Sequence, residues 1–436
     1  MKKVFIWILI LVLIAAVSVN IWLFYKREAS FKVQIPAQTQ GLMRINTERI
    51  IKKNIFSDLR DSVKSSTGYG LNIPLNIFVY NFSHDEKEGW ASVFKIIEPQ
   101  KFQTFLNKYF TEKTGADIEG VEVYKTSKAP IYCITQHDKA IFAYAKNDSI
   151  GYWINELLAE NNFIDLSESK FAKIKKESDD LFVMLNNKEL SVNFQKGLIR
   201  TALLLDNINT QIDTAYSPAT DTSAAALLAY KGKLPNDLMQ YFIKDRANIS
   251  IDSIALHLRP GLYFQSKGGT PQWVKKVAYE YDDNFEKKET ATSELRQVPL
   301  SFLEMNADST LCDYLTKNKM LIEDSVDREA FPLYALYGKC STNSFLLSTA
   351  KDYIPQRSVS SFIPNKKVLK GYIDFTKMHD AAKWSAWHSY LVHLQHIEAL
   401  GSIEDKQLLI DAKLRLTEQD TNAFATLYKA LLTILR

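Results

Sequence analysis

The chain has 436 residues, with 54 lysines and arginines against 50 aspartates and glutamates, and a formal net charge of +4. This near balance excludes the strong basic surplus that is typical of nucleic-acid-binding proteins, so no nucleic-acid partner is expected. Apolar residues make up 46% of the chain and aromatic residues 12%, which predicts a folded protein. The length exceeds that of one ordinary hydrophobic core, so two or more packed units are expected.

The apolar segment Val4–Tyr25 contains no charged residue and predicts a transmembrane helix. At about 1.5 Å per residue it reaches roughly 33 Å, enough to cross a bilayer core of about 30 Å. Lys2 and Lys3 precede it, and Trp22 and Tyr25 lie near its far end, where aromatic rings favour the boundary between water and lipid. We therefore expect the lipid bilayer to be a partner of the chain through this segment.

The positive tail at residues 1–3 favours an N-terminus that stays in the cytoplasm, with the rest of the chain exported. This predicts a single-pass protein of the inner (cytoplasmic) membrane whose bulk is extracytoplasmic, in the periplasm. One alternative is a cleaved signal peptide, for which Ala16 and Ser18 would supply the small residues before the cut. Another is a C-terminal domain left in the cytoplasm. The apolar run continues to Phe24, which favours an uncleaved anchor.

A tether is expected at residues 26–34, followed by a first α+β unit over 35–180. Helices are predicted to begin at Thr47 and Pro99. A further helical stretch, interrupted near Phe163, is predicted over 150–177. The predicted strands of this unit are residues 41–46, 75–82, 90–97, 121–124, 131–135 and 140–145.

A second unit is expected over residues 181–436. It begins with a strand at 181–185 and continues with a helix outlined by Leu190, Phe194, Leu198 and Ala202. The alternation at 249–258 predicts a strand that turns at 259–261 into another strand at 262–265. The charged stretch 280–296 predicts a solvated face or an excursion from the core. The remaining elements expected are strands at 391–403 and 407–417 and a helix at 422–435.

An internal repeat links the two units. Ile35-Pro36 and Ile45-Asn46 recur at the same spacing as Ile363-Pro364 and Ile373-Asp374. Each apolar strand ends in Asn or Asp, a residue type that caps the first turn of a following helix. Strands ending at Asn186 and Asn306 repeat the second half of the pattern. The expected fold class is therefore α+β, an N-terminal transmembrane helix followed by a duplicated, mixed and mostly antiparallel sheet-and-helix ectodomain.

Three stretches carry a resemblance to a known class of proteins. They are IPAQTQGLMRIN (35–46), KIIEPQKFQTFLNKYF (95–110) followed by GVEVYK, and LLIDAKLRLTEQDTNAFATLYKALL (408–432). These resemble a broad class of uncharacterised bacterial envelope proteins, which carry an N-terminal anchor or lipoprotein signal and a duplicated α+β ectodomain of unknown function. The resemblance covers most of residues 31–436. It implies a location and a fold, and it transfers no catalytic residue.

Four of the seven histidines lie within residues 379–396, and three of them, His388, His393 and His396, are candidate metal ligands. Their spacing does not fit a standard zinc motif. On a helix His388 and His393 would lie about 140° apart, and on a strand His393 and His396 would point to opposite faces. We therefore expect no metal site. Trp384 and Trp387 could stack on a sugar or contact a membrane, but such a pair more often packs on a sheet.

The other candidates for chemistry have simpler structural interpretations. Carboxylates at residues 85–88 and 282–286 lie in turn-like or lysine-mixed segments typical of solvated surface. Ser167–Lys170 has a serine–lysine spacing, but Ser167 is better placed to cap a helix. The sequence contains no nucleophile elbow, phosphate-binding loop, zincin motif or calcium-binding loop. We expect no catalytic residue and no cofactor.

The three cysteines leave two interpretations open. Cys312 and Cys340 could form a disulfide in an oxidising compartment, with Cys133 buried and free. Alternatively, all three are buried thiols that act as small apolar residues.

These observations predict a membrane-anchored extracytoplasmic protein, non-enzymatic, that binds a partner or has a structural role in the bacterial envelope. An envelope protein, a glycan or a lipid could be that partner. The alternative is a periplasmic hydrolase or a glycan- or lipid-binding protein, which would require a cleft in the ectodomain.

Overall fold

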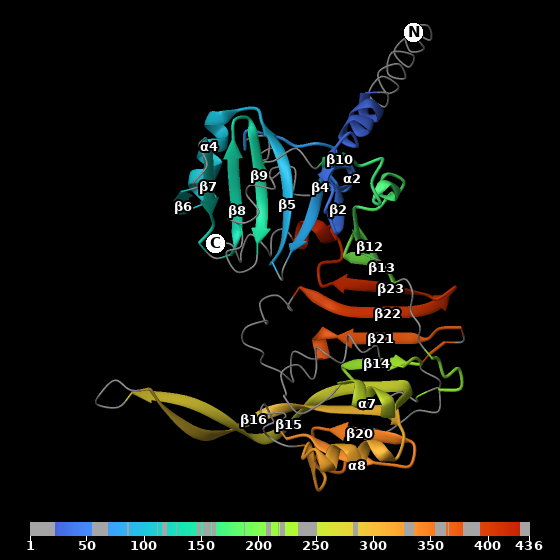
Figure 1. Cartoon of the computed structure of the whole chain (residues 1–436). Coiled ribbons are helices and arrows are strands. Elements are labelled where there is room, and N and C mark those ends of the chain that lie inside the picture. Colours follow the sequence, from blue (N-terminus) through green and yellow to red (C-terminus); the bar gives the residue numbers. More distant parts are fainter. Residues whose placement is uncertain are drawn as a thin grey trace, which may run out of the picture. The chain divides into compact units, whose positions relative to one another are not determined.

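The structure, a computed structural model (Figure 1), divides the chain into two compact units. Unit 1 consists of residues 1–201 and 420–436, and unit 2 of residues 202–419. The division expected at residues 180 and 181 therefore falls within unit 1. The residues that the structure describes are 22–54, 69–84, 87–110, 112–115, 120–127, 129–145, 150, 158, 163–186, 188–205, 211–216, 218, 223–233, 251–281, 287–326, 335–353, 363–364, 366–377 and 393–427.

Unit 1 is built on an antiparallel sheet. Its described strands pair in the order β6–β7–β8–β9–β5–β4–β2–β11–β12, and β3 pairs with one end of β5. A separate pair joins β1 and β10. The bounds are β1 (Gln34–Pro36), β2 (Gly41–Asn46), β3 (Leu71–Asn72), β4 (Asn76–His84), β5 (Lys87–Ile96), β6 (Glu112–Gly115), β7 (Val121–Lys125), β8 (Ile131–Gln136), β9 (Lys139–Ala145), β10 (Phe163–Asp165), β11 (Leu181–Leu185) and β12 (Lys188–Gln195).

Alternating burial gives this sheet two apolar faces. On β9, Ile141 and Ala143 belong to one core, which also contains Leu42 from β2. Residues at the alternate positions, such as Phe142, face a second core. The helix α4 (Pro99–Tyr109) covers that second face, burying Phe102 and other residues of its apolar side. Its first residue is the proline predicted to start it.

A shorter helix, α2 (Thr47–Asn54), follows β2 directly. The backbone N–H of Arg49 donates to the side-chain oxygen of Asn46 over 3.0 Å, so Asn46 caps the helix as its sequence position predicts. The 3₁₀ helix η3 (Ala172–Lys175) and β10 lie where a longer helix over 150–177 was predicted. That prediction is wrong for residues 163–177, where Asp165, Leu166 and Ser169 accept turn hydrogen bonds from backbone N–H groups.

Unit 2 is likewise built of antiparallel strands. Its described strands pair in the order β23–β22–β21–β14–β15–β16–β20–β19–β18–β17. The bounds are β14 (Ala226–Tyr230), β15 (Leu258–Tyr281), β16 (Lys287–Ala307), β17 (Leu321–Ile322), β18 (Ser325–Val326), β19 (Tyr337–Cys340), β20 (Ser344–Ser348), β21 (Leu369–Asp374), β22 (Leu394–Glu404) and β23 (Gln407–Leu416), with helices α7 (Ile251–His257) and α8 (Thr310–Lys317).

Two predictions of element type fail in this part of the chain. Residues 251–257 form the helix α7 and not a strand, because the buried Ile254, Ala255 and Leu258 follow helical spacing as well as they follow alternation. The helix predicted through Leu190 and Phe194 is instead β12 followed by β13 (Leu198–Leu205). Four-residue spacing places residues on one face of a strand as well as of a helix, so the pattern did not discriminate.

The hairpin of β15 and β16 is much longer than its neighbours (Figure 1). β14 pairs with it only along residues 262–266, and β20 only along 302–306. The excursion predicted at residues 280–296 lies in this hairpin, although residues 282–286 are outside the description. Trp273 and Leu295 are directly opposite each other, and 66% and 58% of their surfaces are exposed.

Taken together, the described residues form a mixed α+β protein with extensive antiparallel sheet and few helices. Among them, no helix is both long and apolar enough to cross a membrane. The predicted span Val4–Tyr25 lies outside the described residues except for its last four positions. Residues 22–30 are helical, so the expected tether at 26–34 begins within a helix.

Candidate functional site

The helical residues 22–30 are fixed to unit 1 by a charged contact. The Arg27 guanidinium donates to the Glu48 carboxylate, with Nε 3.1 Å from Oε2 and Nη2 2.9 Å from each oxygen. Lys52, one turn further along α2, donates to Glu48 Oε1 over 2.6 Å. The Glu48 side chain is only 7% exposed, which makes this a partly buried contact with fork geometry.

Two further contacts complete what we call the helix clamp, formed by Arg27, Ser30, Phe31, Glu48 and Asn76. The Asn76 side-chain amide donates to Ser30 Oγ over 2.8 Å. The Phe31 ring is buried in the core and lies 6.0 Å from the ring of Phe78. Polar contacts and apolar packing therefore attach the end of this helix to the core of unit 1.

The charge on Glu48 is favoured by the clamp. Burial alone would raise the pKa of Glu48, but hydrogen bonds from Lys52 and Arg27 outweigh burial and hold that pKa below its ordinary value. The carboxylate therefore stays ionised at neutral pH and keeps its contact with Arg27.

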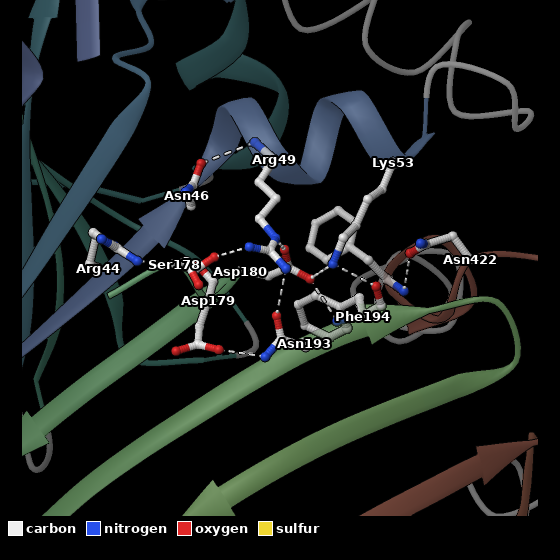
Figure 2. A network of polar contacts seen from close by, with 11 residues as sticks. Arg44, Asn46, Arg49, Lys53, Ser178, Asp179, Asp180, Asn193, Phe194 and Asn422 are labelled. Atoms are coloured by element: carbon white, nitrogen blue, oxygen red, sulfur yellow. Dashed lines mark hydrogen bonds and ion pairs between the residues drawn. The ribbon is translucent and has the colours of Figure 1, made fainter. Parts of the chain in front are cut away.

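A second network, shown in Figure 2, surrounds Asp180 at the start of β11. The Asp180 side chain is fully buried. Its Oδ1 lies 2.9 Å from Arg49 Nε and its Oδ2 2.5 Å from Lys53 Nζ, so two cations from one face of α2 neutralise it. The backbone N–H of Phe194 on β12 donates to Oδ2 over 2.7 Å. Arg49 also donates to the carbonyl oxygen of Ser178.

Arg44 is the second buried charge of this region, and only 1% of it is exposed. Its guanidinium donates to the carbonyl oxygens of Ile174 over 2.8 Å and Asp179 over 3.2 Å. Burial lowers the pKa of Arg44, while the negative charge of Asp179 opposes that change. Together Arg44 and Asp180 attach the segment before β11 to β2, α2 and β12.

In both networks, that of Glu48 and that of Asp180 and Arg44, the charged side chains bind other side chains or backbone groups of the protein. A carboxylate that is buried and paired with two cations is a poor general base, because abstracting a proton would remove the charge that its partners stabilise. Asp180, Arg44 and the Arg27–Glu48 pair were not predicted from the sequence. One signal was available for Arg44: it follows the apolar Leu42 by two positions on a strand, and so lies on the same buried face.

Two of the three histidine candidates, His393 and His396, lie among the described residues. His388 lies outside the described residues. The His393 carbonyl accepts a hydrogen bond from Thr417 N, and His396 lies opposite Asp374 in the pairing of β21 with β22. Among the described residues, no group of three or more His, Cys, Asp or Glu side chains is arranged to hold a metal ion.

His396 does have a polar neighbourhood in unit 2. Its ring lies 6.0 Å from that of Tyr372, whose hydroxyl donates to Asp374 Oδ2 over 3.2 Å. Asp374 Oδ1 in turn accepts hydrogen bonds from the backbone N–H groups of Thr376 and Lys377, which makes it a helix cap. Burial would raise the pKa of Asp374, but these hydrogen bonds and that from Tyr372 lower it overall.

A third cluster, which the sequence did not indicate, joins His257, Asp308 and Thr310. Thr310 Oγ1 lies 2.6 Å from Asp308 Oδ1 and 2.8 Å from His257 Nδ1, and His257 Nδ1 lies 3.2 Å from the same carboxylate oxygen. Asp308 also accepts from Thr310 N, at the start of α8. Hydrogen bonds from Thr310 lower the pKa of Asp308 despite a small opposing effect of burial, and His257 adds to this. The arrangement caps a helix.

Ser167 and the three cysteines are remaining candidates that lie among the described residues. Ser167 is exposed in a turn, and it is Ser169 whose hydroxyl donates to Leu166 O, over 2.8 Å. Residues 85–86, 282–286, Trp384 and Trp387 lie outside the description. Cys312 and Cys340 form a disulfide with their Cα atoms 6.3 Å apart, within the usual range. Cys133 is free, and burial raises the pKa of its thiol to about 12.

The sequence matches no protein-family model and no curated protein. Among solved structures, crystal form I of TP0453 aligns with 73% of this chain and 93% of its own, at 6% identity and a TM-score of 0.20. Crystal form IV aligns with 74% and 94%, at 8% identity and the same TM-score. Similarity at this level carries no argument about fold or function.

Proposed function

We propose that the chain is a membrane-anchored extracytoplasmic protein that acts as a non-enzymatic scaffold of the bacterial envelope. The observation that carries this proposal is the helix clamp. Residues 22–30 continue the apolar segment Val4–Tyr25, and Arg27 and Phe31 attach them to the folded unit. A scaffold that presents a domain at a membrane needs such a connection, whereas an enzyme released into solution does not.

The disulfide between Cys312 and Cys340 supports export of unit 2. Disulfides form and persist in oxidising compartments such as the bacterial periplasm, and are rare in the cytosol. Inner-membrane location, with the N-terminus in the cytoplasm and the bulk of the chain in the periplasm, agrees with this pairing.

The duplicated architecture is part of the proposal. Asn46 and Asp374 both end an antiparallel strand and both accept hydrogen bonds from the backbone N–H groups two or three residues later. These are the positions that the Ile-Pro repeat aligns. Equivalent corners in unit 1 and unit 2 are expected if one strand–helix scaffold was duplicated.

The non-enzymatic role is supported by how ionisable groups are used. Asp180, Glu48, Asp308 and Asp374 each have partners that fasten backbone segments or cap helices. A hydrolase or a glycan- or lipid-binding protein would need convergent polar groups in a cleft.

The proposal is tested with the full chain in intact bacterial cells. After lysis and an alkaline wash, we expect the chain in the membrane pellet. We also expect Cys312 and Cys340 to resist thiol labelling until a reductant is added. A Cys312→Ser, Cys340→Ser variant is the control for the labelling. Recovery in the soluble fraction, or free thiols at these positions before reduction, would contradict the proposal.

A further inference from the structure

Residues 22–30 are attached at one end of the unit 1 sheet, and apolar side chains are exposed at the same end. The pairing register defines this end: Asn46 pairs with Asn76, and Ile96 with Leu71. The opposite end carries Gly41, Asn81 and Gly89. We call the first the clamp end, because Ser30 and Arg27 contact Asn76 and Glu48 there. Figure 1 shows the helix leaving unit 1 from this side.

Two loops at the clamp end expose isoleucines. Ile73 lies between β3 and β4 and is 43% exposed, and Ile97 follows β5 and is 54% exposed. The loop of Ile73 is next to the clamp, since the Pro74 carbonyl accepts from Thr47 Oγ1 over 2.6 Å and the Leu75 carbonyl from Thr47 N over 3.0 Å.

The loop of Ile97 is held firmly. The backbone N–H groups of Ile97 and Glu98 donate to the Gly70 carbonyl over 2.9 and 3.1 Å. Gly70 has φ +71°, and a Cβ there would lie 2.2 Å from the Glu98 carbonyl oxygen, so only glycine fits. Ile97 is therefore presented by a fixed turn. The exposed Ile97 side chain does not contribute the stabilisation that burying an isoleucine would give.

The helix at the same end is also apolar on its surface. Trp22, Phe24 and Tyr25 are 57%, 56% and 68% exposed. Tryptophan and tyrosine favour the interface of a bilayer, and the segment before them is the predicted span. A bilayer around the predicted span would bring an apolar medium to the end of unit 1 that carries these isoleucines.

We propose that the clamp end is a membrane-contact face, in which Ile73 and Ile97 insert into the interfacial layer of the bilayer around the anchor. The inference rests on the proposed anchor, since that segment brings the bilayer to this end. It adds that unit 1 lies directly on the lipid surface. Lysines next to Ile97 are paired with carboxylates, Lys101 with Glu98 at 2.5 Å and Lys95 with Asp138 at 3.4 Å, so we assign the attraction to the isoleucines. The contact is apolar, and anionic lipid is not required.

The test places an environment-sensitive fluorophore on single cysteines introduced by Ile73→Cys, Ile97→Cys and Trp22→Cys in the full chain. Each variant is reconstituted in phosphatidylcholine nanodiscs whose acyl chains carry nitroxide quenchers. Tyr144→Cys is the matched control, because Tyr144 is 46% exposed on the same sheet and pairs with Trp90, away from the clamp end. The buried Cys133 and the paired cysteines leave the introduced thiol as the reactive one.

We expect quenching at positions 22, 73 and 97 to exceed that at 144 several-fold. Quenching at position 22 with none at 73 and 97 would overturn the membrane-contact face and leave the anchor intact. No quenching at any of these positions would overturn the anchor as well. Equal quenching at 73, 97 and 144 would show non-specific contact and would also contradict the inference.

Discussion

Asp180 in unit 1 and Asp308 in unit 2 are both hydrogen-bonded aspartates, but their partners and surroundings differ. Asp180 is fully buried, and its partners Arg49, Lys53 and Phe194 come from distant parts of the chain. The Asp308 side chain is 29% exposed and bonds mainly to Thr310, two residues away. Burial and sequence distance, more than residue type, therefore decide what each aspartate contributes to the fold. Asp180 joins three segments, whereas Asp308 starts one helix.

The largest effect is expected from Asp180→Asn. The amide keeps the size of the side chain but leaves Arg49 and Lys53 without their shared negative charge, which costs about 3 kcal/mol for a buried pair. Hydrogen-exchange mass spectrometry of the full chain should show faster exchange in β2, α2 and β11, and no change in peptides of unit 2. Unchanged amide exchange rates in unit 1 would show that the Asp180 network does not stabilise these segments.

Arg44→Met should have the next largest effect. The apolar side chain fills a similar volume but leaves the carbonyl oxygens of Ile174 and Asp179 without a donor, at a cost of about 2 kcal/mol. The loss should appear in exchange at residues 172–185. Arg200→Met makes the same change at an exposed position of β13 and should shift stability by less than about 0.5 kcal/mol. Equal effects of the two substitutions would contradict the role of burial.

Asp308→Ala should cost about 1 kcal/mol, the usual loss for a helix cap. Because the cluster is local, faster exchange should be confined to the first turn of α8. A loss of stability as large as that of Asp180→Asn would remove the distinction between the two aspartates.

The smallest effect is expected from Lys95→Ala. Lys95 and Asp138 are 65% and 58% exposed, and exposed ion pairs contribute less than about 0.5 kcal/mol. Thermal unfolding of the variant should coincide with that of the unchanged chain. A clear fall in melting temperature would show that surface pairs matter more here than burial predicts.

Much of the fold of unit 1 followed from the sequence, because its elements are amphipathic and carry strong end signals. Pro99 starts α4 and Asn46 caps α2 at the predicted positions. The cap predicted by analogy at Asn186 is wrong, since that residue has φ +52° and turns β11 into β12. At Asn306 the strand continues, and Asp308 caps α8 instead. The same residue type serves caps and hairpin turns, so the pattern alone could not decide.

The Glu48 and Asp180 networks could not be predicted from a single sequence. Arg27 and Glu48 are 21 residues apart, and Lys53 and Asp180 are 127 apart. No periodicity links positions at such distances, because their proximity depends on the order of strands in the sheet. The candidates that the sequence did offer, His393, His396 and Ser167, were chosen by residue type and not by proximity.

The helix clamp can be tested directly. A spin label at Ala29→Cys in the full chain, reconstituted in nanodiscs, reports whether residues 22–30 are fixed to unit 1. Because the pKa of Glu48 is held below its ordinary value, the Arg27–Glu48 contact contributes fully above that ordinary value and is lost only as the pH falls through the lower pKa of the folded state. We predict an immobilised label at pH 7, a mobile one in Glu48→Gln, and no change in Glu28→Gln. A label that is mobile at pH 7 in the otherwise unchanged chain would contradict the account.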